Sequence, residues 1–206
     1  MGWIVVALLA LVVLWWVFAA SKHAEPPADV SMVPEHFVVF DLETTGLDAD
    51  RHEIIEIGAI RVHRDADEHQ TFQTLVKPSK RVPKRITELT GITNQMIQAD
   101  GLELVEALSE FRDFVGDLPL VAFNAEFDDA FLRAACATTS TDHCANEVCC
   151  ALQLSRRAWP WRKSFRLADI SRDGNLSLDD THRALGDCRR TMIVYIAAAR
   201  EVGSYR

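Results

Sequence analysis

The sequence has few cysteines, and their spacing predicts neither a disulfide nor a zinc site. There are five, an odd number without disulfide-like spacing, which excludes a disulfide-stapled secreted domain and favours a reducing compartment. Cys144, Cys149 and Cys150 do not follow a zinc-ligand pattern, so we expect the cysteines to be packing residues. The sequence also lacks internal repeats and low-complexity tracts, which excludes a repeat architecture.

Basic residues are scarce as well. With 22 Lys and Arg against 30 Asp and Glu, the formal net charge is −8, and this total argues against a nucleic-acid partner. The distribution argues the other way, because Lys77–Arg85 and Arg156–Arg166 each hold five cations and no acid. The second tract also contains Trp159, Trp161 and Phe165. Such tracts hold phosphates and stack unpaired bases, although a solvated basic face with its tryptophans packed on the core remains an alternative.

Charge is absent from the N-terminal segment. Trp3 to Ala20 are 18 consecutive apolar residues, about 27 Å of helix and close to the ~30 Å hydrocarbon core of a bilayer. We expect an uncleaved, single-pass transmembrane anchor. A cleaved signal peptide is the competing interpretation, but the run is longer than the usual hydrophobic region and no clear cleavage site follows.

Residues 21–35 are polar, contain three prolines and predict an exposed linker. Lys22 is the only Lys or Arg close to the anchor, and by the positive-inside rule it favours a cytoplasmic catalytic domain. The expected location is therefore the inner (cytoplasmic) membrane.

The segment HFVVFDLETTGLD predicts a buried strand that ends in carboxylates and a glycine turn. Residues two apart on a strand share a face, so Asp41 and Glu43 are expected side by side. Two adjacent carboxylates at the end of an apolar strand repel each other, and a hard divalent cation is the simplest compensation. Taken alone, the pair is also compatible with a solvated strand edge.

A second acidic segment follows a short predicted strand at 120–123. An amphipathic helix is expected from Ala125 to Ala137, with Asp128 on its first turns near the end of the sheet. Glu126 and Asp129 are close by, and all three acids could instead be first-turn residues favoured by the helix dipole.

The third segment, SLDDTHRALGDCRR, predicts a loop that leads into a long C-terminal helix beginning at about Arg183. His182 and Asp187 are five residues apart, about 140° around an ideal helix, so they could not share one helical face. We therefore expect His182 in the entry loop and Asp187 on the helix. A histidine here, taken alone, is more typical of a surface or capping residue.

Together these segments resemble the DEDDh (DnaQ-like) 3′–5′ exonucleases, the family of the proofreading epsilon subunit of bacterial DNA polymerase III. The matching motifs are Asp41 to Gly46 (DLETTG), Leu89 to Thr93 (LTGIT), Asn124 to Asp128 (NAEFD) and His182 to Asp187 (HRALGD). The resemblance covers about Glu35 to the C-terminus. One departure is Phe123, where many relatives carry a histidine.

The resemblance implies a site with two Mg²⁺ or Mn²⁺ ions, in which His182 is the general base for the attacking water. The implied metal ligands are Asp41, Glu43, Asp128 and Asp187. The implied substrate contacts are Thr44, Thr45, Leu89, Thr90 and Asn124. The reaction expected is hydrolysis at single-stranded 3′ ends of nucleic acid, with DNA as the first expectation, releasing nucleoside 5′-monophosphates. An exoribonuclease or oligoribonuclease stays open, as does a membrane-tethered accessory proofreading subunit of a polymerase or repair complex.

The predicted fold is α/β. Two β-rich runs, HEIIEIGAIRVHRD and EHQTFQTLVKP, predict an antiparallel hairpin beside the Asp41 strand. Helices are expected at Gly101 to Val115, Ala125 to Ala137, Asn146 to Ala158 and from about Arg183. The resemblance makes this a ribonuclease H-like mixed sheet flanked by helices. The predicted organisation is an anchor at 3–20, a linker at 21–35 and one exonuclease domain at 36–206.

Overall fold

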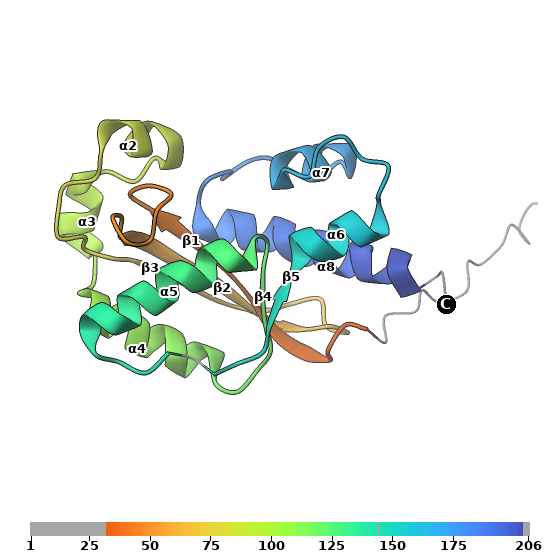
Figure 1. The fold of residues 1–206 in the computed structure, drawn as a ribbon, viewed down its shortest axis with the longest axis horizontal. Coiled ribbons are helices and arrows are strands. Elements are labelled where there is room, and N and C mark those ends of the chain that lie inside the picture. The colour runs from red at the N-terminus through yellow and green to blue at the C-terminus, as the bar shows by residue number, and fades with distance from the viewer. Residues whose placement is uncertain (1–31, 144, 204–206) are drawn as a thin grey trace, which may run out of the picture.

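A five-stranded sheet forms the centre of the protein, with helices on both faces (Figure 1). The computed structural model describes residues 32–143 and 145–203. In chain order the elements are β1 (His36–Thr44), β2 (Ile54–His63), β3 (Gln70–Leu75), α2 (Lys84–Thr90), α3 (Asn94–Asp100), α4 (Leu104–Val115), β4 (Leu120–Ala122), α5 (Ala125–Thr139), β5 (Val148–Cys150), α6 (Ala151–Ala158), α7 (Leu167–Asp173) and α8 (Ala184–Gly203).

The sheet is mixed, with the strand order β3-β2-β1-β4-β5. β2 pairs antiparallel with β1 and with β3, whereas β4 pairs parallel with β1 and with β5. The predicted hairpin beside the Asp41 strand and the predicted mixed α/β sheet are both confirmed. Because β1 is central, its end is reached by elements from both faces of the sheet.

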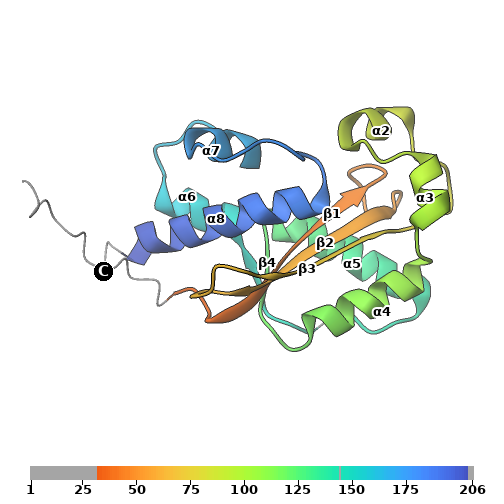
Figure 2. The ribbon, with the colours of Figure 1, turned by 180° about the vertical axis from the view of Figure 1, so that it is seen from behind.

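The two faces of β1 contribute to different cores. Val38 and Phe40 pack into the core beneath α4 and α5, and Phe37 packs into a second core with residues of α8. Figure 1 shows α5 in front of the sheet, and Figure 2, from behind, shows α8 in front of it. Because successive side chains of a strand alternate between faces, Asp41 and Glu43 lie on the α8 side with Phe37.

One predicted helix is wrong in its first part. The prediction placed a helix at Asn146 to Ala158, but Val148–Cys150 is β5, and the helix begins only at Ala151. The three β5 residues pair in parallel with Leu120–Ala122 of β4. This long-range pairing outweighs the local helical pattern. The helices α4, α5 and α8 lie close to their predicted ranges.

The predicted anchor at Trp3 to Ala20 lies outside the described residues, as does most of the predicted linker. Within 32–143 and 145–203, no helix is both long and apolar enough to cross a membrane. The linker prediction differs from the structure at Val33, which is only 1% exposed and packs with Tyr195 and Ala199 of α8. The last residues before β1 therefore belong to the folded domain.

Candidate active site

The first two predicted ligands lie at the end of β1. Asp41 and Glu43 are two residues apart on this strand, and Glu43 is 9% exposed. The ladder between β1 and β2 shifts register between Glu43 and Thr44. Irregularities of this kind end regular pairing and turn side chains toward a site. Asp41 and Glu43 both lie just before this irregularity, in the last four residues of the strand.

Asp128 reaches the same place from the opposite layer. It lies in the first turn of α5, is 3% exposed, and its charge acts on the Asp41 carboxyl. The neighbouring Asp129 is engaged elsewhere, because its carboxylate pairs with Arg133 at 2.6 Å and with His143 at 3.0 Å. Among the three acids considered for this turn, the structure thus brings Asp128 to the carboxylates of β1.

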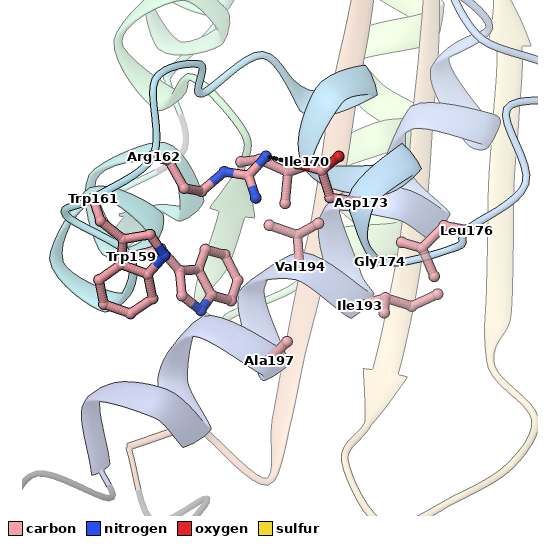
Figure 3. A pocket seen from close by; sticks show the side chains of 10 residues that line it. All are labelled: Trp159, Trp161, Arg162, Ile170, Asp173, Gly174, Leu176, Ile193, Val194 and Ala197. Carbon is pink, nitrogen blue, oxygen red and sulfur yellow. Dashed lines mark hydrogen bonds and ion pairs between the residues drawn. The ribbon is translucent and has the colours of Figure 1, made fainter.

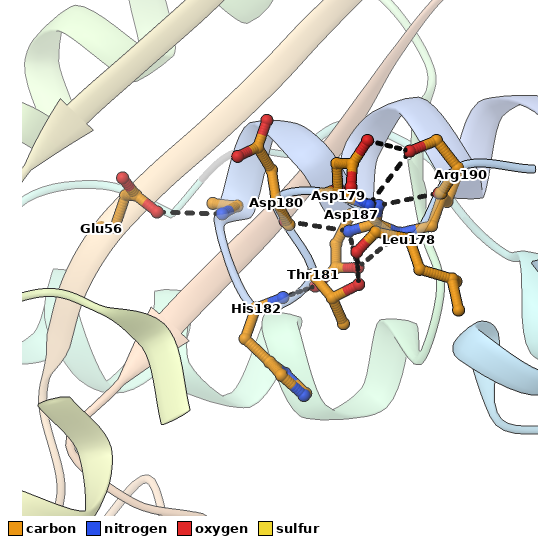
Figure 4. A network of polar contacts seen from close by, with 10 residues as sticks. Glu56, Leu178, Asp179, Asp180, Thr181, His182, Asp187 and Arg190 are labelled. Carbon is orange, nitrogen blue, oxygen red and sulfur yellow. Dashed lines mark hydrogen bonds and ion pairs between the residues drawn. The ribbon is translucent and has the colours of Figure 1, made fainter. Parts of the chain in front are cut away.

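His182 and Asp187 are held together at the start of α8. The helix begins at Ala184, so the expectation that His182 precedes it and Asp187 lies on it is confirmed, and Asp187 is in its first turn. His182 adopts a left-handed backbone conformation with φ 63°. Its backbone N–H donates a hydrogen bond of 3.1 Å to Oδ2 of Asp187 (Figure 4). The imidazole remains exposed to solvent.

These side chains share one cavity of about 470 Å³. Asp41, Glu43, His182 and Asp187 all line it. Ligand atoms of Glu43, His182 and Asp187 lie within 4.8 Å of one another, close enough to hold a metal ion. Four of the five predicted core residues therefore line a single cavity, and Asp128 is buried beside it.

Three carboxylates in this cluster, Asp41, Glu43 and Asp128, are unfavourable as anions. Burial raises the pKa of Asp41 well above its usual range, and the charges of Asp128, Asp187 and Glu43 raise it further. Burial also raises the pKa of Glu43 to about 8 and that of Asp128 to about 7. Carboxylates that are desolvated and crowded together retain protons unless a cation offsets their charge.

Three residues important to this geometry were missed by the sequence analysis. Glu56 of β2 is fully buried and binds Arg183, the residue that follows His182. Arg190 is 4% exposed and binds Oδ1 of Asp187 at 2.8 Å. A signal was present for Glu56, since a lone acid interrupts the apolar run of IIEIGAI. Nothing comparable marked the two arginines.

The five predicted substrate contacts have different surroundings. Thr44, Leu89 and Thr90 line the cavity, and the Leu89 side chain is 52% exposed at its edge. The Thr45 hydroxyl accepts a hydrogen bond from the backbone N–H of Glu53 and contacts His52. Asn124 directly precedes α5 and is exposed. Neither Thr45 nor Asn124 is among the residues that line the cavity.

The first basic tract reaches the same cavity, since Arg85 of α2 lines it together with the exposed Leu47. A guanidinium at the edge of an acidic cavity is suited to a phosphate group.

The second basic tract borders a separate, mostly apolar pocket of about 300 Å³ between α7 and α8 (Figure 3). Trp159 and Trp161 line it on one side, and the Trp161 side chain is 67% exposed. Arg162 is held by an ion pair of 2.6 Å with Asp173. Trp159 is partly buried, so neither the base-stacking role nor packing on the core is decided for this tract.

Comparison with known proteins identifies the domain. The family model described as "Exonuclease" (RNase_T) matches residues 38–195. The DNA polymerase III subunit epsilon of Aquifex aeolicus is 35% identical over 166 residues, covering 81% of this chain and 81% of that protein. The PolC-type DNA polymerase III of Halalkalibacterium halodurans is 35% identical over 164 residues, covering 80% of this chain but only 11% of that protein.

The fold likeness agrees with the sequence matches. The crystal structure of E. coli exonuclease I in complex with a dT13 oligonucleotide matches with a TM-score of 0.68 and 22% identity, over 82% of this chain and 41% of that chain. The predicted exonuclease fold, with a mixed sheet between helices, is confirmed. The chain belongs to the RNase_T exonuclease family, as its DnaQ-like motifs predicted.

Proposed function

We propose that this protein is a 3′–5′ exonuclease that removes nucleoside 5′-monophosphates from single-stranded 3′ ends of DNA with the help of two divalent metal ions. The observation that carries the proposal is the shared cavity, which brings Asp41, Glu43, His182 and Asp187 from β1 and the start of α8 to one place. Asp128 completes the set from α5.

The donor set fits Mg²⁺ or Mn²⁺. Asp41, Glu43, Asp128 and Asp187 supply only carboxylate oxygens, the ligands that these hard cations prefer. The raised pKa values of Asp41, Glu43 and Asp128 reflect burial, and those of Asp41 and Glu43 also reflect crowding by other carboxylates, which a divalent cation offsets. When bound, two ions supply the positive charge that activates a water molecule and shields the phosphate.

His182 is suited to accept a proton from the attacking water. Its imidazole lies next to the carboxylates of Glu43 and Asp187 but is exposed, so a proton can pass from it to solvent. Its backbone is fixed through the hydrogen bond to Asp187, which directs the ring toward the cavity. The cavity is also lined by Arg85, which can hold a phosphate, and by Leu47 and Leu89, which can contact the terminal base.

DNA is the preferred substrate because the polymerase relatives are DNA polymerases and the exonuclease I structure contains a dT13 oligonucleotide. An exoribonuclease remains the alternative within the same chemistry, since the carboxylates do not contact the sugar that distinguishes RNA from DNA. An accessory proofreading role is a second candidate, supported by the match over 81% of a polymerase subunit.

We further propose that the domain is tethered to the inner membrane by Trp3 to Ala20, with its catalytic domain in the cytoplasm. The support is the sequence alone, in which 18 apolar residues precede a proline-containing linker. The anchor would then bring the exonuclease to a polymerase or repair complex at the membrane without a separate docking domain.

One experiment tests the activity directly. The purified protein is incubated with 3′-labelled single-stranded DNA, duplex DNA and RNA, each with Mg²⁺, Mn²⁺ or EDTA, and an Asp41→Asn variant serves as the control for contaminating nucleases. We expect metal-dependent release of mononucleotides, fastest from single-stranded DNA. Products from internal cleavage, or equal activity in the Asp41→Asn variant, would contradict the proposal.

A further inference from the structure

Glu56 is a buried carboxylate next to the site that is not one of the predicted metal ligands. It lies on β2 directly opposite Glu43 of β1, and it is 0% exposed. It accepts hydrogen bonds from Nη2 of Arg183 at 2.6 Å and from the backbone N–H of Ala184 at 2.9 Å. Gln73 donates a further bond of 2.9 Å. Such charge-assisted bonds hold a buried carboxylate in one orientation.

Two of the residues that bind Glu56, Arg183 and Ala184, are the two residues after His182. Arg183 also donates its Nε to both carboxylate oxygens of Glu56 at 3.2 Å, so the guanidinium is bound through two nitrogens. The start of α8 approaches β2 so closely that a Cβ at Gly58 would lie 2.6 Å from the backbone of Ala184. The glycine permits this contact and Glu56 fixes it.

The turn before α8 needs such support because its backbone is strained. Asp180 and His182 both have positive φ angles, 56° and 63°, which non-glycine residues rarely adopt. On the other side of the turn, Arg190 donates to the backbone carbonyls of Asp179 at 2.8 Å and Asp180 at 3.0 Å (Figure 4). The turn that carries His182 is therefore held by hydrogen bonds to Glu56 after the histidine and to Arg190 before it.

We propose that Glu56 and Arg183 are positioning residues that hold His182 in the left-handed turn and keep the Arg183 guanidinium away from the metal-binding carboxylates. The inference rests on the proposed exonuclease function. Neither side chain needs to touch the substrate. Their effect passes through the backbone at 182–184, which sets where the imidazole stands relative to Glu43 and Asp187.

The second part of the proposal follows from the charges. Arg183 binds Glu56 at 2.6 Å, and Glu56 lies directly opposite Glu43 in the ladder between β1 and β2, so the guanidinium is held near this metal-binding carboxylate. Without Glu56, the partly exposed guanidinium would be left with Asp180 and the metal-binding Glu43 as the remaining carboxylates whose charges act on it. An arginine bound to Glu43 would compete with a metal ion. Glu56 thus keeps the Arg183 guanidinium apart from the site of the metal ions.

The positioning can be measured without turnover. Hydrogen–deuterium exchange is followed in peptides that cover 178–187, using the full-length protein and the variants Arg183→Gln and Glu56→Gln. Arg172→Gln is the matched control, because it removes an exposed arginine that pairs with Asp169 on α7. We expect exchange at 178–187 to rise about tenfold or more in the two test variants, as loss of a charge-assisted hydrogen bond predicts, and to stay unchanged in the control. Unchanged protection in Arg183→Gln would overturn the proposal.

Turnover then separates positioning from substrate binding. In Arg183→Gln we expect kcat on single-stranded DNA to fall about 10²-fold while KM changes less than about threefold, since a small misplacement of a catalytic group affects rate rather than binding. Arg183→Lys keeps the charge but not the two-nitrogen bond, and we expect it to recover only part of kcat. Full recovery by lysine, or a loss confined to KM, would contradict a positioning role.

The outcomes also separate this inference from the proposed function. If the wild-type protein is inactive but exchange at 178–187 rises in Arg183→Gln, the exonuclease proposal is refuted and the positioning role of Glu56 and Arg183 is retained. Normal kcat in Arg183→Gln would refute the positioning role and retain the exonuclease proposal. If Glu56→Gln fails to fold, the partly exposed Arg183 still provides both measurements.

Discussion

Replacing Glu43 with glutamine should stabilise the metal-free protein at neutral pH while destroying the metal site. Glu43 is 9% exposed, and burial together with the charges of Asp187 and Glu56 raises its pKa from 4.5 to about 8. A carboxyl whose pKa is higher in the folded than in the unfolded state favours folding most below its unfolded pKa. That contribution is lost as the pH rises from 4.5 to about 8.

The magnitude follows from the two pKa values. Between them, each pH unit lowers the free energy of unfolding by about 1.36 kcal/mol, because the unfolded chain has released the proton and the folded chain has not. From pH 4.5 to pH 7 the loss is about 3 kcal/mol. Glutamine at position 43 keeps the shape of the side chain but does not titrate, so the variant should lack this part of the pH dependence.

The assay is urea unfolding in EDTA at pH 5, 6, 7 and 8, comparing wild type with Glu43→Gln. We expect the free energy of unfolding of the variant, relative to that of the wild type, to increase by about 2–3 kcal/mol between pH 5 and pH 7. Glu110→Gln, at an exposed position of α4, is the control and should follow the wild type. Added Mg²⁺ should stabilise the wild type and have little effect on Glu43→Gln. A difference between Glu43→Gln and wild type that does not change with pH would refute the reasoning.

Three further predictions concern the same machinery. Asp41→Ala or Asp187→Ala should abolish turnover; Asp41→Ala should do so without unfolding the protein, because it removes a carboxylate from a mutually repelling cluster, whereas Asp187→Ala also removes the ion-pair partner of the buried Arg190 and should lower stability; activity within tenfold of wild type in single-strand degradation would contradict the assignment. His182→Ala should slow turnover by about 10²–10⁴-fold and leave Mn²⁺ binding intact, as calorimetry can check; a loss of metal affinity as large as in Asp187→Ala would make His182 a ligand. Deleting residues 1–23 should give an active protein in the supernatant, while the full-length chain fractionates with membranes and resists carbonate extraction; an insoluble or inactive deletion would place the apolar segment in the domain's core.

The features that sequence predicted well are those that depend on local pattern. Alternation along β1 placed Asp41 and Glu43 on one face, and the angle between His182 and Asp187 on an ideal helix predicted that the histidine stands before α8. The helical period also located α4 and α5 to within a few residues. Each of these conclusions requires only neighbouring residues.

The features that sequence did not predict depend on residues far apart in the chain. β5 is a strand because Val148–Cys150 meets β4, a contact that no local pattern encodes. The helices α2, α3 and α7 have seven residues each, too short for a clear helical period. Glu56 holds the start of α8 only because Arg183, 127 residues later in the chain, binds its carboxylate. Its sequence signal, an acid in an apolar strand, has no partner until the fold is known.

The fold also decides whether a membrane tether is compatible with catalysis. Val33, the buried residue just ahead of β1, packs against Tyr195 and Ala199 in the second half of α8. Asp187 is at the other end of that helix, and the twelve helical steps from residue 187 to residue 199 span about 18 Å. A tether that precedes Val33 therefore joins the domain away from the cavity. The tether proposed above is therefore compatible with access of a nucleic-acid 3′ end to Asp41 and Glu43.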